Sequence, residues 1–159
     1  MLTASSPFTL VLFGASGHLA TQKLYPALYV LALKKRLPEH YAVLGFARSA
    51  MDETSFRALV SQAVSAQMPE VTRPALEEFL THCYYLQGQY DRLEDFQRLQ
   101  GTLEQLEQPH GAWVRLAYLS IPPTLFTAVL RNLCAGHIHD AEHPFRCIME
   151  KPVGHDLQS

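Results

Sequence analysis

The sequence is poor in several features that define whole classes of protein. It contains no apolar run of the roughly 18 residues needed to cross a bilayer, and its N-terminus lacks the basic start of a signal peptide. Its net charge is only -2, so it has no basic excess of the kind that attracts nucleic acid or anionic membranes. We therefore expect a soluble, cytoplasmic protein with no nucleic-acid or membrane partner.

Cysteine is also scarce. The three cysteines, Cys83, Cys134 and Cys147, are odd in number, lie far apart and include no Cys-x-x-Cys pair. This arrangement argues against a disulfide framework and is typical of a reducing compartment.

A metal site near the C-terminus is the one alternative role for these cysteines. Zinc accepts ligands of the types found there: Cys134, His137, His139, His143 and Cys147. Cys147, however, falls within an expected strand, and the others occupy a loop of unspecified geometry. The prediction is therefore an exposed polar loop with no metal.

What the sequence does contain is an apolar run, 8–13, that leads into a glycine turn and then a helical pattern. Such a run is typical of a strand buried on both faces of a parallel sheet. Gly14 permits a sharp turn, Gly17 leaves the main chain open to a phosphate, and Ala20 allows close packing of the next helix. The helix N-terminus favours an anion, so the pattern predicts a pyrophosphate site.

A second apolar run, 41–47, is followed directly by Arg48 and Ser49. In a dinucleotide-binding unit the end of the second strand meets the adenosine ribose, where an acidic residue selects NAD. No acid stands here. An arginine and a hydroxyl instead suit a 2′-phosphate, which predicts NADP as the cofactor.

Strands and helices alternate along the whole chain. This order predicts an α/β fold: a Rossmann-type, doubly wound, mainly parallel sheet with helices on both faces, forming one dinucleotide-binding domain over 1–159. We expect Pro26 to bend the first helix or mark its start, and Asp91 to open a capping box with Glu94. Strands are expected at 8–13, 41–47, 83–87, 113–120 and 144–149, and helices at 19–36, 53–67, 72–80, 91–107 and 125–135.

The candidate ligand-binding residues all follow the ends of expected strands, which meet at one edge of a parallel sheet. They are the segment Gly14 to Leu19, Arg48, the break at Ser120-Ile121-Pro122, and Lys151.

At these positions the chain resembles the glucose-6-phosphate dehydrogenase family along nearly its whole length. The motifs that carry the resemblance are Gly14-Ala15-Ser16-Gly17-His18-Leu19-Ala20, Gly45-Phe46-Ala47-Arg48-Ser49, Gly88-Gln89-Tyr90-Asp91, Tyr118-Leu119-Ser120-Ile121-Pro122-Pro123-Thr124 and Glu150-Lys151-Pro152-Val153-Gly154. The resemblance implies NADP-dependent oxidation of glucose 6-phosphate at C1 to 6-phosphogluconolactone, in the pentose phosphate pathway.

The resemblance also implies roles for single residues. Lys151 contacts both substrate and coenzyme, and Pro152 fixes the geometry of that contact. Phe126 stands where some members have a tyrosine that touches the coenzyme. The implied coenzyme-binding set is Gly14, Ala15, Ser16, Gly17, His18 and Leu19 for the pyrophosphate, Arg48 and Ser49 for the 2′-phosphate, and Pro122, Phe126 and Lys151.

The chain departs from the family pattern in two ways. His18 replaces the usual aspartate, and the family's catalytic segment with its general-base histidine is absent, as is the substrate and dimerisation domain. Hydride transfer from an alcohol needs such a base. We therefore expect little or no turnover from this chain alone, and self-association through surface that a second domain would cover. The alternative is a stand-alone NADP-binding or sensing module without catalysis.

Overall fold

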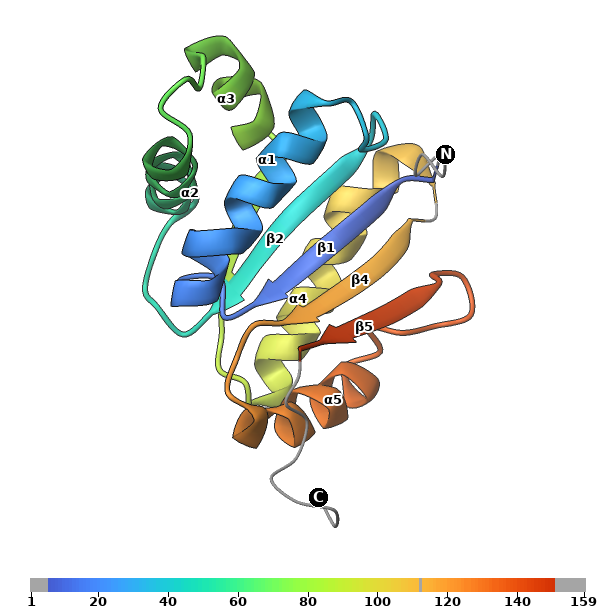
Figure 1. Ribbon diagram of the computed structural model, residues 1–159. Coiled ribbons are helices and arrows are strands. Elements are labelled where there is room, and N and C mark those ends of the chain that lie inside the picture. The colour runs from blue at the N-terminus through green and yellow to red at the C-terminus, as the bar shows by residue number, and fades with distance from the viewer. Residues whose placement is uncertain (1–5, 112, 151–159) are drawn as a thin grey trace.

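The computed structural model describes residues 6–111 and 113–150. Five parallel strands form one sheet in the order β3-β2-β1-β4-β5 (Figure 1). The expected α/β fold with a parallel sheet is therefore confirmed. The strands are β1 (Phe8–Phe13), β2 (Tyr41–Ala47), β3 (Cys83–Gln87), β4 (Val114–Leu119) and β5 (Phe145–Met149).

The central position of β1 follows from its composition. All six of its residues are buried, and consecutive residues of a strand point to opposite faces. The strand must therefore be covered on both faces, which explains its apolar composition. Phe8 pairs with Tyr41 of β2 on one side and with Val114 of β4 on the other. The chain order reverses at β1, so the crevice for a ligand lies beyond the carboxyl ends of β1 and its two neighbours.

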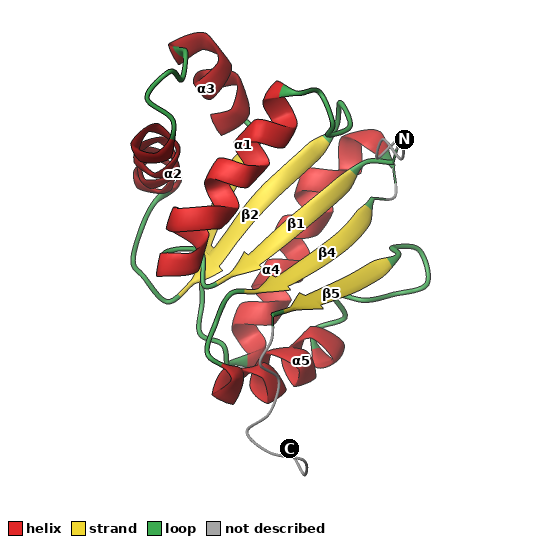
Figure 2. Ribbon diagram, viewed as in Figure 1, coloured by secondary structure: helices red, strands yellow, loops and turns green. Residues whose placement is uncertain are grey.

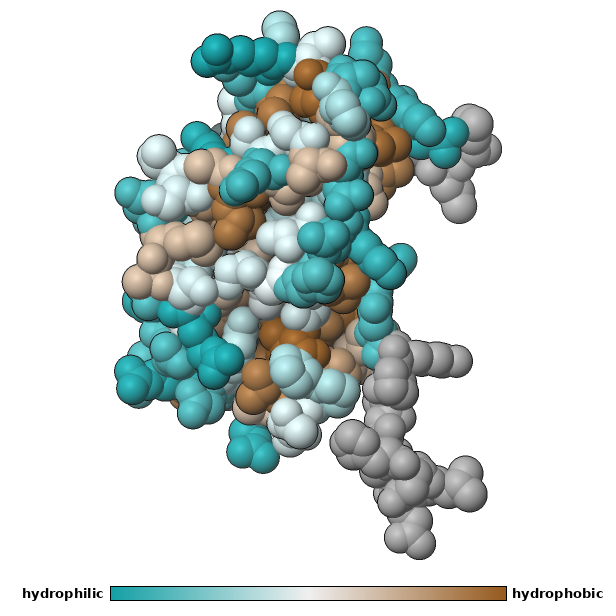
Figure 3. All heavy atoms as spheres, turned by 60° about the vertical axis from the view of Figure 1, so that its left-hand side comes forward, coloured by the Kyte–Doolittle hydropathy of each residue, from teal (hydrophilic) through white to brown (hydrophobic). Residues whose placement is uncertain are grey.

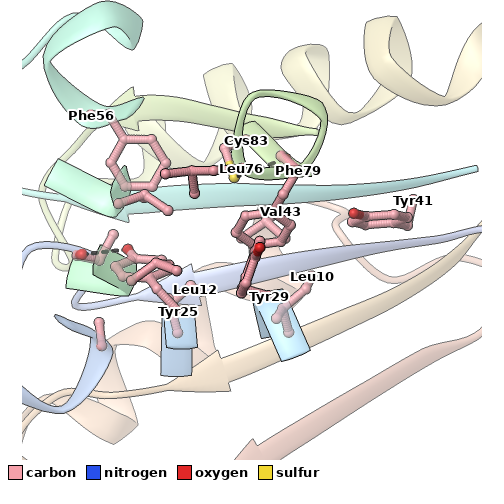
Figure 4. Packing of buried hydrophobic residues seen from close by; sticks show 14 of the residues in the cluster. Leu10, Leu12, Tyr25, Tyr29, Tyr41, Val43, Phe56, Leu76, Phe79 and Cys83 are labelled. Carbon is pink, nitrogen blue, oxygen red and sulfur yellow. Dashed lines mark hydrogen bonds between the residues drawn. The ribbon is translucent and has the colours of Figure 1, made fainter. Parts of the chain in front are cut away.

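Helices cover both faces of the sheet, as Figure 2 shows. Three of them pack over β1, β2 and β3 on one face, where Tyr25, Phe56 and Phe79 form a core (Figure 4). Two pack on the other face around Phe13, Phe96 and Val129. The first three are α1 (Tyr25–Leu33), α2 (Glu53–Gln67) and α3 (Arg73–Leu80), and the other two are α4 (Leu93–Glu107) and α5 (Phe126–Ala135).

Residues near the helix N-termini affect how two of the helices begin, and one expected cap is wrong. Pro26 is the second residue of α1, and the π-helical turn Ala20–Leu24 runs directly into it, so its missing N–H removes one internal hydrogen bond of this helical stretch. Asp52 Oδ1 accepts from the Ser55 N–H at 2.7 Å and caps α2. The expected capping box at Asp91 is wrong, because α4 begins at Leu93 with no side-chain cap. Asp95 instead reaches back and accepts from the Gln89 N–H at 2.7 Å.

A charged cluster is buried beside the start of β4. The Arg115 guanidinium, with no exposed surface, donates to Glu107 Oε2 at 2.8 Å. Thr9 Oγ1 also donates to Glu107, and His143 Nε2 lies 3.4 Å from it. Burial of this pair is possible because nearly every polar atom in it has a partner.

One part of the sheet carries no helix. On the face of α1, the strands β4 and β5 of the described chain lie uncovered (Figure 1), and Ile148 of β5, which pairs with Tyr118 on this face, is 41% exposed. Within the described residues, none of the helices is both long and apolar enough to cross a membrane.

Candidate functional site

The glycine turn after β1 is held close to the end of β4. Gly14 has φ +84°, and its N–H donates to the Phe46 carbonyl at 3.1 Å. A Cβ at Gly14 would lie 2.1 Å from the Ser120 carbonyl oxygen. Only glycine therefore fits, for its backbone conformation and for the space available.

The turn is stabilised from the helix that follows it. The Tyr25 hydroxyl, fully buried, donates to the Ala15 carbonyl oxygen, and burial raises the pKa of Tyr25 well above its ordinary value. A π-helical turn, Ala20–Leu24, precedes α1. Such turns are frequent at functional sites, and here the turn leads directly into the helix that carries Tyr25.

Beyond the strand ends lies a cavity of about 210 Å³, which we call the coenzyme cavity. It brings together the glycine turn, the end of β2 and the β4 break, as the sequence predicts for residues that follow parallel strands. Ser16 Oγ and Ser49 Oγ lie 2.9 Å apart across it. Its lining consists of Gly14, Ser16, Gly17, Ala47, Arg48, Ser49, Tyr90, Ser120, Ile121, Pro122 and Leu125.

Arg48 and Ser49 are positioned by aromatic residues from the next strand and loop. The Arg48 guanidinium lies over the Tyr90 ring, 5.7 Å from its centroid. The Tyr85 hydroxyl donates to the carbonyl oxygens of Ala47 and Ser49. Within residues 6–111 and 113–150, Arg48 forms no ion pair, so its charge is available to an anion.

Tyr90 and Tyr85 were not among the predicted site residues. Tyr90 follows the end of β3, so the rule that selected Arg48 could have found it. Tyr85 lies inside a strand, where no sequence signal separates a residue that holds a loop from one that fills the core.

A second cavity, of about 310 Å³, adjoins the first and shares Ser120, Ile121 and Pro122 with it. Leu19 and Phe126 line this cavity, together with Glu150 at the end of β5. The Tyr118 hydroxyl donates to Glu150. Desolvation is the larger cause and the Glu150 carboxylate the smaller cause that together raise the pKa of Tyr118 to about 12. Phe126 therefore lies beside the second cavity and not in the coenzyme cavity.

The remaining predicted site residues lie apart. The Ala15 side chain is buried in the core, and His18 is exposed and lines neither cavity. Lys151 and Pro152 lie outside the described residues. Among the proposed zinc ligands, His143 binds Asp140 at 2.9 Å, and the described part of the chain contains no group of three metal-binding side chains.

The geometry suits a dinucleotide. The residue Ser120 lines both cavities, while its Oγ is sealed from solvent and has no hydrogen-bond partner in the described part of the chain. A buried polar atom of this kind needs a partner. The open glycine turn, the Arg48 guanidinium, which forms no ion pair within the described residues, and the hydroxyls of Ser16 and Ser49 are donors of the kind that phosphates and ribose hydroxyls accept.

Comparison with known proteins agrees with this geometry. The model of the family "Glucose-6-phosphate dehydrogenase, NAD binding domain" matches residues 11–159. Glucose-6-phosphate 1-dehydrogenase of Caenorhabditis elegans is 39% identical over 160 residues, and the chloroplastic enzyme of Nicotiana tabacum is 39% identical over 159.

Solved structures give the same result. A glucose-6-phosphate dehydrogenase in complex with its substrate glucose-6-phosphate superposes with a TM-score of 0.89 at 30% identity over 99% of this chain and 33% of that one. The enzyme from Mycobacterium avium superposes with a TM-score of 0.82 at 26% identity, over 96% and 31% of the two chains. The matches span 99% and 98% of this chain but 30% and 26% of the two curated relatives. The chain belongs to the glucose-6-phosphate dehydrogenase NAD-binding domain family.

Proposed function

We propose that this chain is the coenzyme-binding domain of an oxidoreductase that moves a hydride from C1 of glucose 6-phosphate to NADP, giving 6-phosphogluconolactone. The observation that carries the choice of coenzyme is Arg48 at the end of β2, with Ser49 beside it and no carboxylate in the lining of the cavity. An acid there would repel a 2′-phosphate, whereas an arginine pairs with it.

Each part of the coenzyme cavity has its own task in this proposal. The glycine turn, from Gly14 to Leu19, binds the pyrophosphate through main-chain N–H groups. Arg48 and Ser49 bind the 2′-phosphate. The bound coenzyme supplies the hydride acceptor, and Pro122, together with Phe126 of the adjoining second cavity, forms an apolar wall that limits water next to it.

Lys151 and Pro152, which follow Glu150 in the sequence, bind substrate and coenzyme together in this proposal. Oxidation of a hydroxyl also requires a base to remove its proton. No histidine appears among the described residues that line the two cavities. We therefore propose that the 159-residue chain binds coenzyme with little turnover, and that it self-associates through the uncovered face of β4 and β5.

Equilibrium titration with NADP+ and NAD+ tests the coenzyme assignment. NADP+ should bind more tightly, and Arg48→Ala should weaken NADP+ by roughly 10- to 100-fold, the usual size of a charge-assisted contact, while NAD+ changes little. Arg131→Ala, an exposed arginine on α5, is the matched control. Equal affinity for the two coenzymes would sink the assignment.

A second candidate is an NADP-binding module without catalysis, favoured by the absence of histidine from the described cavity walls. An assay with glucose 6-phosphate and NADP+ on this chain, and on a longer chain of the length of its relatives, separates the two. Turnover by the longer chain alone supports the enzyme. Binding without turnover in both supports the module.

A further inference from the structure

A groove of about 440 Å³ lies where β2 begins, and the coenzyme cavity lies at the opposite end of the strands. We call it the α1–α3 groove, because the end of α1, the side of α3 and the start of β2 form its walls. Its volume is in the range of small-molecule sites. In Figure 3, the upper part of the molecule, where these elements lie, shows hydrophobic residues among hydrophilic ones.

The way α1 ends opens this groove. Lys35 has φ +52°, a left-handed conformation that is uncommon for a residue with a side chain. Its N–H donates to the Ala32 carbonyl at 2.9 Å, so the chain turns sharply away from the helix. This turn leaves Leu33 on the groove wall with 56% of its surface exposed.

Two tyrosines in the groove have side-chain hydroxyls without a hydrogen-bond partner among the described residues. Tyr29 is 2% exposed and Tyr41 is 7% exposed, and both line the groove. Their rings are fixed: Tyr29 lies edge-on against Phe79 (Figure 4), and Tyr41 is stacked on His82 with the ring centroids 3.9 Å apart. Neither hydroxyl bonds to any residue of 6–111 or 113–150, and neither is among the polar atoms sealed from solvent. The hydroxyls are therefore available to a ligand in the groove.

The charged groups around these hydroxyls are mostly acidic. Glu39 and Glu78 line the groove with Lys35, and none of the three belongs to an ion pair in the described chain. Glu78 acts on Tyr41: after burial and Cys83, its charge is the third cause that raises the pKa of Tyr41, which stays a protonated donor. His82 Nδ1 is engaged with the Tyr41 carbonyl at 2.8 Å.

We propose that the α1–α3 groove binds a small organic cation, an ammonium group carried on an apolar body such as an aryl-alkyl chain. The ammonium lies between the carboxylates of Glu39 and Glu78 and the tyrosine hydroxyls, which accept its hydrogen bonds. The apolar body covers Leu33, whose side chain is exposed on the groove wall. A phosphate-bearing coenzyme is excluded, because the two carboxylates repel it.

Binding of phenethylammonium to the full 159-residue chain tests this proposal, followed by amide chemical shifts in a nuclear magnetic resonance titration. Two probes of similar shape are compared with it: 3-phenylpropanoate, which carries the opposite charge, and neutral 2-phenylethanol. Phenethylammonium should shift the amides of Tyr41 and His82 and should bind at least fivefold more tightly than either probe. Glu78→Gln should weaken it about fivefold, and Tyr41→Phe about threefold.

Glu94→Gln, an exposed glutamate at the start of α4, is the matched control and should leave the affinity unchanged. Three results would each overturn the proposal: no shift at the groove, equal affinity for the anionic probe, or full affinity in Glu78→Gln. Both groove variants keep their side-chain shape, so a fold check by circular dichroism is sufficient to read the titration.

Discussion

The Tyr25 hydroxyl and the Ala15 carbonyl form a buried hydrogen bond that joins the first helix to the glycine turn. Both side chains are completely buried. The turn therefore owes its shape to a residue ten positions further along the chain as well as to its glycines. This contact gives the turn a fixed form before any ligand arrives.

Tyr25→Phe tests that contact, because it keeps the ring and removes only the hydroxyl. The Ala15 carbonyl loses its partner inside the core, so the free energy of unfolding should fall by about 1–3 kcal/mol. Affinity for NADP+ should fall as well, since the turn becomes looser. Urea unfolding and coenzyme titration measure the two effects. Tyr84→Phe, whose half-buried ring stacks on Arg57, should change neither; equal loss in both variants would contradict the idea.

Gly14→Ala should destabilise the glycine turn strongly, although it adds only one methyl group. The new methyl group meets the Ser120 carbonyl oxygen and forces alanine into a left-handed conformation, a conformation that alone costs about 1–2 kcal/mol. We expect a loss of more than about 2 kcal/mol of stability and loss of coenzyme binding. Gly101→Ala is the matched change: it lies within α4 with open space around it, and it should stabilise the protein by about 0.5–1 kcal/mol. Thermal unfolding of both variants decides the point.

Arg115 and Glu107 depend on each other inside the core. Arg115→Met strands a buried carboxylate and should cost about 3–5 kcal/mol, whereas the double change Arg115→Met with Glu107→Leu should recover much of that loss. Guanidinium unfolding of the two single variants and the double variant measures the coupling. Strict additivity of the two single losses would show that the pair does not interact.

Asp95 makes the free energy of unfolding depend on pH in the acidic range. Desolvation tends to raise its pKa, but hydrogen bonds from Gln89 and Arg98 outweigh it and hold the pKa of Asp95 below its usual value. A lowered pKa in the folded state gives stability that is present above the unfolded pKa, near 4, and is lost as pH falls through the folded value.

Asp95→Asn should therefore lower the free energy of unfolding at pH 7, by about 1 kcal/mol, and make little difference at pH 2. Urea unfolding at the two pH values gives the comparison. Asp91→Asn, an exposed change two residues before α4, is the matched control. The prediction fails if Asp95→Asn costs the same at both values.

Much of this fold could be predicted because the signals are local. Buried parallel strands require apolar runs such as 8–13, and Asp52 marks a helix start by chemistry that acts within a few residues. The gathering of the candidate site residues was also predictable, because the carboxyl ends of parallel strands all lie on the same side of the sheet. Gly14, Arg48 and Ser120 meet there for that reason.

What could not be predicted depends on contacts between distant segments. Asp91 has the spacing of a cap, yet the loop before α4 bonds to Asp95, and only the packed structure decides between the two acids. Arg115 has the sequence context of a strand residue, while its burial depends on Glu107 from a helix and Thr9 from another strand. The free hydroxyls of Tyr29 and Tyr41 have no counterpart in any motif.

The position of β1 in the middle of the sheet also affects how the protein is made. The ribosome produces β1 first, but its second neighbour, β4, comes only after most of the chain described here. Until β4 arrives, one edge of the most apolar strand has no partner, and Gly14 has no Ser120 carbonyl beside it. Folding that waits for distant pairing is slow and exposes such edges to aggregation. A newborn chain therefore exposes this edge of β1 until β4 has been synthesised.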